Sequence, residues 1–104
     1  MAQVVLDVSG LPGDPLDAAR HFHVMQVPMA RDLLSESDID ALAIVFESAG
    51  KPHQGWQLAV VQALAREAAP KRVNGLAGGK DEAIIEALGW LAKAPGITGQ
   101  LLAV

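Results

Sequence analysis

Short apolar runs alternate with segments of helical periodicity along the whole chain. The runs are of strand length and rich in β-branched residues, so they predict four buried strands, at residues 4–8, 39–46, 72–76 and 97–104. Between these runs the apolar residues recur at steps of three and four, which is typical of amphipathic helices. This alternation of strands and helices predicts an α/β protein with a parallel sheet.

The first connection between strands predicts two helices. Asp14 is placed to cap a helix, and Pro15 would occupy its first turn, where a missing N–H costs nothing. Pro28 would cost about 3 kcal/mol inside one straight helix. We therefore expect separate helices at residues 15–25 and 28–34.

The two later connections predict one helix each. Apolar residues repeat at helical intervals over residues 53–68, and another helix starts at Asp81. Right-handed crossovers are the economical way to join parallel neighbours. The expected architecture is therefore about four parallel strands with helices on both faces of the sheet.

Composition limits the classes of protein to which the chain can belong. A length of 104 residues, with 51% hydrophobic and 19% charged residues, predicts a single domain over residues 1–104. A mean hydropathy of +0.27 is apolar for a domain of this size, so we expect part of the surface to meet a partner. The net charge of −4, without a basic stripe, argues against nucleic acid and against an anionic membrane as partners.

The chain also has no cysteine, which excludes thiolate chemistry, disulfides and Cys-ligated zinc. The sequence does not open with a basic and apolar leader, and no apolar run approaches the roughly 18 residues that would span a bilayer. We therefore expect a soluble, cytoplasmic protein.

Two tripeptides in the second half of the chain carry a resemblance to a known family. Arg-Val-Asn at residues 72–74 follows a helix that ends in Ala-Arg-Glu-Ala-Ala-Pro, and Thr-Gly-Gln at residues 98–100 precedes the last apolar residues. With these tripeptides at this spacing, residues 64–79 and 82–104 are similar to the C-terminal half of the short-chain dehydrogenases/reductases.

Residues 4–11 and 43–48 resemble, more loosely, the fourth and fifth strands of that family. The resemblance implies a truncated Rossmann-like three-layer sandwich that lacks the family's first strand, its Gly-rich turn and the two following βα units. That turn is where the backbone of such folds approaches the pyrophosphate of a dinucleotide. We therefore expect no cofactor.

The resemblance also assigns positions to the family's catalytic residues. Its Tyr and Lys would fall at Gly50 and Gln54, and the chain contains no Tyr. Ser48 would be the remnant of the catalytic serine, with the loop that normally follows it reduced to Ala49. We expect no catalytic residue. The chain is similar in this respect to the degenerate N-terminal half of the long 3-oxoacyl-carrier-protein reductases, which precedes an active reductase domain.

Three other groups of residues resemble parts of known kinds of site. Gly75 to Asp81 reads like part of a phosphate-binding loop, but the spacing is short, so a flexible turn with Asp81 capping the next helix is favoured. His21 and His23 point to different sides of a helix and have no third ligand, so no metal is expected. His53 has no positioned partner for acid–base work.

A ligand crevice and an interface remain as candidates. Glu47 and Ser48 follow a predicted strand at the edge where open α/β sheets bind ligands, so a small-molecule crevice formed with Asn74 stays open. In the resembling family, the helix pair equivalent to residues 28–34 and 53–68 packs against its mate in a four-helix bundle. The resemblance implies an interface formed here by Leu33, Leu34, Trp56, Val60 and Leu64.

A second candidate interface is the strand at residues 3–8, which truncation would leave with an open edge. Two classes of function follow from these observations. The favoured one is a non-catalytic structural or interaction module that forms a homodimer or a complex with a companion reductase chain. The alternative is an accessory part of an NAD(P)-dependent oxidoreductase, similar to a ketoacyl reductase, that a partner chain completes.

Overall fold

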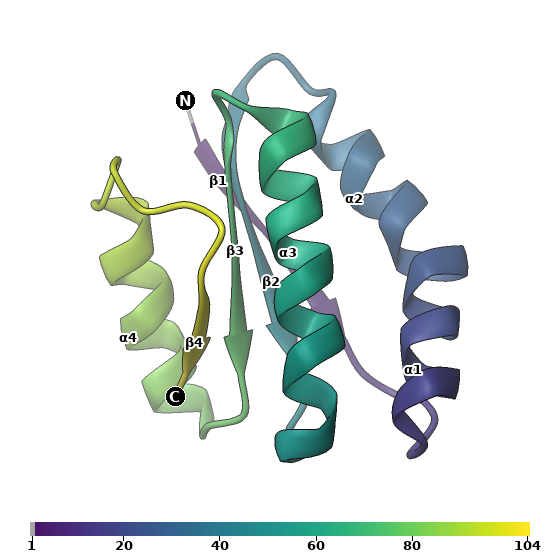
Figure 1. Ribbon diagram of the computed structural model, residues 1–104. Coiled ribbons are helices and arrows are strands. Elements are labelled where there is room, and N and C mark those ends of the chain that lie inside the picture. The colour runs from purple at the N-terminus through teal and green to yellow at the C-terminus, as the bar shows by residue number, and fades with distance from the viewer. Residues whose placement is uncertain (1) are drawn as a thin grey trace.

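The apolar runs of the sequence form one parallel sheet. The computed structural model describes residues 2–104, and its four strands lie in the order β1-β2-β3-β4 (Figure 1). The predicted α/β class is confirmed, as a truncated Rossmann-like sandwich with helices on both faces of the sheet. The strands are β1 (Ala2–Val8), β2 (Ile39–Phe46), β3 (Arg72–Ala77) and β4 (Leu101–Ala103).

Helices form where the periodicity predicts them. Asp14 caps the first helix, because its Oδ2 accepts a hydrogen bond from the Asp17 N–H at 3.0 Å. The first two connections lie on one face of the sheet and the third on the other (Figure 1). The helical segments are α1 (Pro15–His21), the π-helical η1 (Phe22–Gln26), α2 (Val27–Leu34), the 3₁₀ segment η2 (Lys51–His53), α3 (Gln54–Ala68) and α4 (Asp81–Ala92).

The break expected at Pro28, between helices at 15–25 and 28–34, is wrong. Segments α1, η1 and α2 follow one another without a gap. In η1 the hydrogen bonds reach one residue further back, so that the Val27 N–H donates to the carbonyl of Phe22. Pro28 then lies in the first turn of α2, where its missing N–H is not needed. The π-helical turn thus accommodates the proline without ending the helix.

The last strand is shorter than the predicted range 97–104. Only Leu101–Ala103 pair with β3. Ile97 lies in the loop before β4, and its side chain packs against the core beneath α4. The apolar residue at the start of this run therefore fills the core and does not extend the strand.

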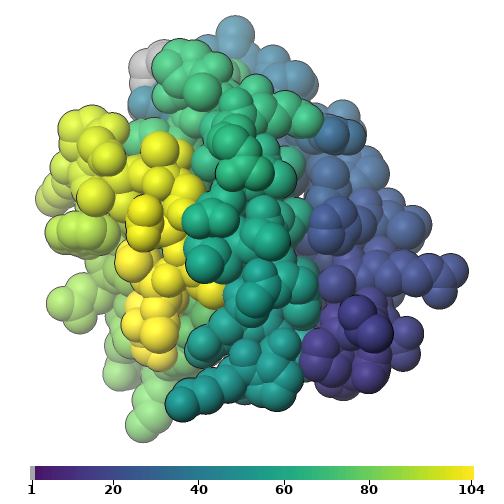
Figure 2. Space-filling view, viewed as in Figure 1, coloured from purple at the N-terminus to yellow at the C-terminus, as the bar shows by residue number. Residues whose placement is uncertain are grey.

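Two apolar cores hold the layers together. The larger lies between the sheet and α1–α2 and α3, and in it the rings of Phe22, Phe46 and Trp56 meet with centroids 5.4 to 5.7 Å apart. The smaller lies between the sheet and α4 and includes Leu76 and Leu91. Figure 2 shows α3 beside α1–α2, and these helices form one layer on this face of the sheet.

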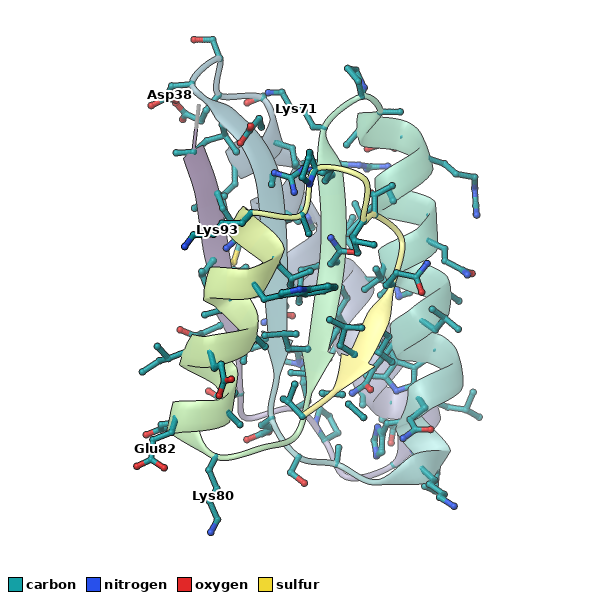
Figure 3. All side chains as sticks on the ribbon, turned by 90° about the vertical axis from the view of Figure 1, so that its left-hand side faces the viewer. Asp38, Lys71, Lys80, Glu82 and Lys93 are labelled. Atoms are coloured by element: carbon teal, nitrogen blue, oxygen red, sulfur yellow. The ribbon has the colours of Figure 1, made fainter. Side chains whose placement is uncertain are left out.

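The connection through α4 differs in hand from the other two. The strand order advances in one direction from β1 to β4, yet α4 lies on the opposite face from α1–α2 and α3 (Figures 1 and 3). The β3–α4–β4 connection moves along the sheet in the same direction as the first two connections but crosses the opposite face. Its crossover therefore has the opposite hand, which is left-handed. The expectation that every crossover is right-handed therefore does not hold for this chain.

Charged side chains connect α2 to α3 and to the loop that follows α3, near the amino ends of the strands. Arg31 donates from Nε and Nη2 to the two carboxylate oxygens of Glu67, both at 2.8 Å. These hydrogen bonds hold the pKa of the Glu67 carboxyl below its ordinary value. Lys71 Nζ donates to the carbonyls of Leu34 and Glu36 at 2.6 and 2.8 Å, which satisfies the end of α2.

Gly75 is the position in β3 where an added side chain would disturb the core. A Cβ atom there would lie 2.9 Å from Leu101 Cδ1 and 3.0 Å from Val61 Cγ2. We expect Gly75→Ala to lower the free energy of unfolding by about 1–3 kcal/mol, measured by urea denaturation. Gly89→Ala in α4 is the matched control, since its Cβ would meet nothing within 4 Å, and should raise stability by about 0.5–1 kcal/mol. A Gly75→Ala protein as stable as the parent would contradict this packing.

Candidate functional site

The loops that follow β1, β2 and β3 meet at the carboxyl edge of the sheet. The Gly10 N–H donates to Glu47 Oε1 at 2.9 Å, and the Glu47 N–H donates to the Val8 carbonyl at 3.2 Å. On the other side, the Gly78 N–H donates to the Phe46 carbonyl at 3.4 Å. Glu47 lies one residue beyond β2 and thus joins two neighbouring loops.

Two small hollows adjoin at this edge. One, of about 170 Å³, lies between the loop after β1 and the start of α3. The other, of about 140 Å³, lies between the start of α3 and the end of β3. Glu47, Ser48, Ala49 and Gln57 line both hollows. The structure therefore brings together Glu47 and Ser48, two of the three residues proposed for a crevice.

Asn74, the third of those residues, lies elsewhere. It is in the middle of β3 and only 3% exposed. Its Nδ2 donates to the Ile97 carbonyl at 2.9 Å, and its Oδ1 accepts from the Gln100 N–H at 3.1 Å. Both polar ends of the side chain hold the loop before β4, so Asn74 has no free group for a ligand at the carboxyl edge.

The neighbouring residues complete this attachment. The Val73 N–H donates to Thr98 Oγ1 at 3.0 Å, and the Gly99 N–H donates to the Val73 carbonyl at 2.7 Å. Gly99 has a φ of 72°, in the left-handed region that favours glycine. Arg72 Nη1 donates to two carbonyls at the end of α4, both at 3.0 Å. The two tripeptides of the resemblance therefore bind each other and have a structural role.

His53 joins α3 to the loop after β1. It is 5% exposed, and Trp56 Nε1 donates to its Nδ1 at 3.1 Å. Because an indole N–H is only a donor, Nδ1 is the acceptor and the ring proton lies on Nε2. That Nε2–H donates to the Gly13 carbonyl at 3.0 Å. Both ring nitrogens are engaged, so the imidazole has no free nitrogen for proton transfer.

Gly50 and Gln54 occupy the positions that the resemblance gives to a catalytic Tyr and Lys. Both line the 140 Å³ hollow together with Ser48. Gly50 has a φ of 85°, a conformation that favours glycine. Neither residue supplies an ionisable side chain beside the serine.

Carboxylates set the charge of this edge. Asp7, Glu47 and Asp81 line a third hollow of about 380 Å³ between β1, β2 and the start of α4. The N-cap of α4 is Lys80, which corrects the cap expected at Asp81. Figure 3 shows the Lys80 side chain projecting away from the sheet. The groups nearest the hollow are therefore acidic and disfavour phosphate.

His21 and His23 are exposed on the first connection. The His23 Nδ1 lies 2.8 Å from the carbonyl of Ala19 in the preceding turn. Across residues 2–104, no group of three or more His, Asp or Glu side chains is arranged to hold a metal ion. The histidine pair therefore does not gather a ligand set in the described chain.

One family model matches almost the whole chain. It describes the SDR-like family, the short chain dehydrogenase-like proteins, and matches residues 6–104. The chain belongs to the SDR-like family. No curated protein and no solved structure matches its sequence significantly. In the part of this SDR-like chain that the structure describes, no helix has the length and apolar character needed to cross a membrane.

The interface expected on the helices of the SDR-like chain is not an exposed stripe. Leu34, Val60 and Leu64 are buried in the larger core. Leu33 and Trp56 are half-buried against the same core. Leu34, Val60 and Leu64 therefore face the core of their own chain, while Leu33 and Trp56 keep part of their surface exposed. The large apolar side chains that are exposed are spread over several elements: Val5 on β1, Leu16, Val24, Met25 and Met29 on the first connection, Leu58 on α3, and Ile85 and Trp90 on α4.

Gln57 belongs to this edge and was not predicted from the sequence. It lies one turn before Val60 and Val61 on the buried side of α3 and is 3% exposed. Its amide makes no hydrogen bond within residues 2–104. Gln57 stands three and four residues before Val60 and Val61, which places it on the buried face of the predicted helix. A polar residue at such a position indicates a candidate site residue.

Removing the Asn74 amide should loosen the end of the sheet. Asn74→Ala leaves the Gln100 N–H and the Ile97 carbonyl without partners. We expect the free energy of unfolding to fall by about 1–3 kcal/mol, with faster amide exchange at Leu101–Ala103. Gln100→Ala is the control, because it keeps the backbone N–H and removes only an exposed side chain. Unchanged exchange in Asn74→Ala would refute the structural role.

Proposed function

We propose that this SDR-like chain is a non-catalytic interaction module that corresponds to the C-terminal half of a short-chain dehydrogenase. One observation carries the proposal: the sequence contains no tyrosine, and the position that the resemblance gives to it is Gly50. Reduction of a carbonyl needs a proton donor at the carbonyl oxygen. Ser48 has no such group beside it.

The arrangement of the sheet also argues against a complete nucleotide site. Doubly wound sheets bind dinucleotides where the strand order reverses, and the order β1-β2-β3-β4 has no reversal. Asp7, Glu47 and Asp81 at the carboxyl edge would oppose the charge of a pyrophosphate. We therefore expect the chain by itself to bind neither NADH nor NADPH.

The open edge of β1 supports an interaction role. Within residues 2–104, β1 pairs only with β2, so the backbone groups of its outer edge have no strand partner. Val5, on the face of β1 toward α4, is 38% exposed. An edge strand with an exposed apolar side chain is a template for another strand. The occupant we propose is a second copy of this chain, because a two-fold axis pairs the same strand with itself.

The alternative is an accessory part of an NAD(P)-dependent oxidoreductase, similar to a ketoacyl reductase, that a companion chain completes. The same open edge favours it. The companion could add strands on the outer side of β1, so that the strand order proceeds away from β1 in both directions. The sheet would then have the reversal of strand order at which dinucleotides bind. The companion would then own the nucleotide site, and this chain would contribute contacts to the substrate.

A lysine at the edge strand should separate the proposed dimer. Val5→Lys puts a positive charge on the edge strand of both copies, which opposes pairing of β1 with β1. Sedimentation equilibrium should therefore show a dimer for the parent and a monomer for the variant. Val24→Lys is the matched control, since Val24 is 63% exposed but lies on the first helical connection. Pairing through β1 would be refuted if the parent protein is a monomer. It would also be refuted if Val24→Lys is monomeric while Val5→Lys remains a dimer.

Nucleotide binding separates the two candidate functions. NADPH fluorescence is compared between the companion reductase chain alone and a mixture of the companion with this chain. The favoured function predicts the same fluorescence in both samples. The alternative predicts saturable NADPH binding by the complex and by neither chain alone. A titration of the two chains, separately and mixed, distinguishes these outcomes.

A further inference from the structure

Gln57 lines both small hollows of the carboxyl edge and makes no side-chain hydrogen bond within residues 2–104. Only 3% of the residue is exposed, but neither atom of its amide is among the completely buried polar atoms without a partner. The amide is therefore accessible from the hollows, where water or a ligand can pair with it.

The 170 Å³ hollow has aromatic walls. Phe46 and Trp56 line it, and their rings meet edge to face with centroids 5.7 Å apart. The indole N–H is already donated to His53, whose other ring nitrogen is bonded to the Gly13 carbonyl. These side chains therefore offer apolar surface and no free hydrogen-bond donor.

The carboxylate of Glu47 supplies the one charged group of the hollows' lining. Glu47 uses Oε1 for the Gly10 N–H, which leaves Oε2 without a partner within the described chain. The Ser48 hydroxyl and the amides of Gln54 and Gln57 can each accept or donate a hydrogen bond. Glu47 is the only acidic residue that lines either hollow, and no Lys or Arg of residues 2–104 lines them. The lining therefore carries a net negative charge.

We propose that the adjoining hollows bind a small organic amine in its ammonium form. The ammonium N–H groups are donors for Glu47 and Ser48, and Gln57 supplies an amide oxygen. The carbon skeleton packs against the apolar surface of Phe46 and Trp56. Volumes of about 170 and 140 Å³ lie below the roughly 300–1,000 Å³ of sites for drug-sized ligands. The amine therefore has one ring or a few carbon atoms.

This site does not rest on the proposed assembly through β1, because it uses the start of α3 and the loop after β2. The test uses three probes of one shape and different charge: benzylamine, benzyl alcohol and benzoate. With benzylamine we expect saturable NMR shifts at the Ser48 amide, the Gln57 side-chain amide and the Trp56 indole N–H. Benzyl alcohol should bind at least tenfold more weakly, and benzoate should not bind.

Two variants locate the interaction. Gln57→Leu keeps a side chain of similar size but removes the amide, and should weaken benzylamine binding at least tenfold. Glu47→Gln retains an oxygen for the Gly10 N–H and should abolish the preference for benzylamine over benzyl alcohol. Gln62→Leu, an exposed position on α3, is the matched control and should bind benzylamine like the parent.

The proposal is overturned if benzylamine produces no saturable shift at Ser48 and Gln57, or if benzoate binds as tightly as benzylamine. It is also overturned if Glu47→Gln keeps the full preference for the amine, whatever the behaviour of Gln57→Leu. Dimerisation of the parent is measured in separate samples without probe, so the failure of either proposal is recognised independently.

Discussion

Hydrogen bonds between residues 98–100 and β3 fix the last helix and strand on the sheet. α4 crosses the face opposite α3, and β4 pairs through only three residues. Hydrogen bonds from Asn74 and Thr98, with Arg72 at the end of α4, provide an attachment that strand pairing alone would not give. Gly75 then allows Leu101 to pack closely on the sheet. The two tripeptides that resemble the short-chain dehydrogenases/reductases thus hold the end of this sheet together.

The two ends of the sheet have different consequences for function. The β3 end is closed by β4 and α4, whereas β1 has an open outer edge within the described residues. The loops at the carboxyl edge bring together Glu47, Ser48, Gln54 and Gln57, and carboxylates make this edge acidic. We propose that these two surfaces serve association and ligand binding.

Local pattern predicted most of the fold, while side-chain partners required the three-dimensional structure. The run of apolar residues gave the bounds of β2, and Asp14 gave the start of α1. Ile97 extended the last predicted strand wrongly, because an apolar run does not distinguish pairing from core packing. His53, at the end of η2, and Gln57, on α3, are both buried polar residues. One partner of His53, the Gly13 carbonyl, lies 40 residues away in sequence, so only the structure shows that its ring is fully hydrogen-bonded.

We propose that this SDR-like chain performs no dehydrogenase chemistry by itself. This is tested by the absorbance of NADPH during incubation of the pure chain with a small β-ketoester, where we expect a rate of NADPH oxidation equal to that of buffer at every protein concentration. A rate that rises in proportion to protein concentration and disappears in Ser48→Ala would refute the proposal, because it would require a proton donor at the carboxyl edge that the described residues do not provide.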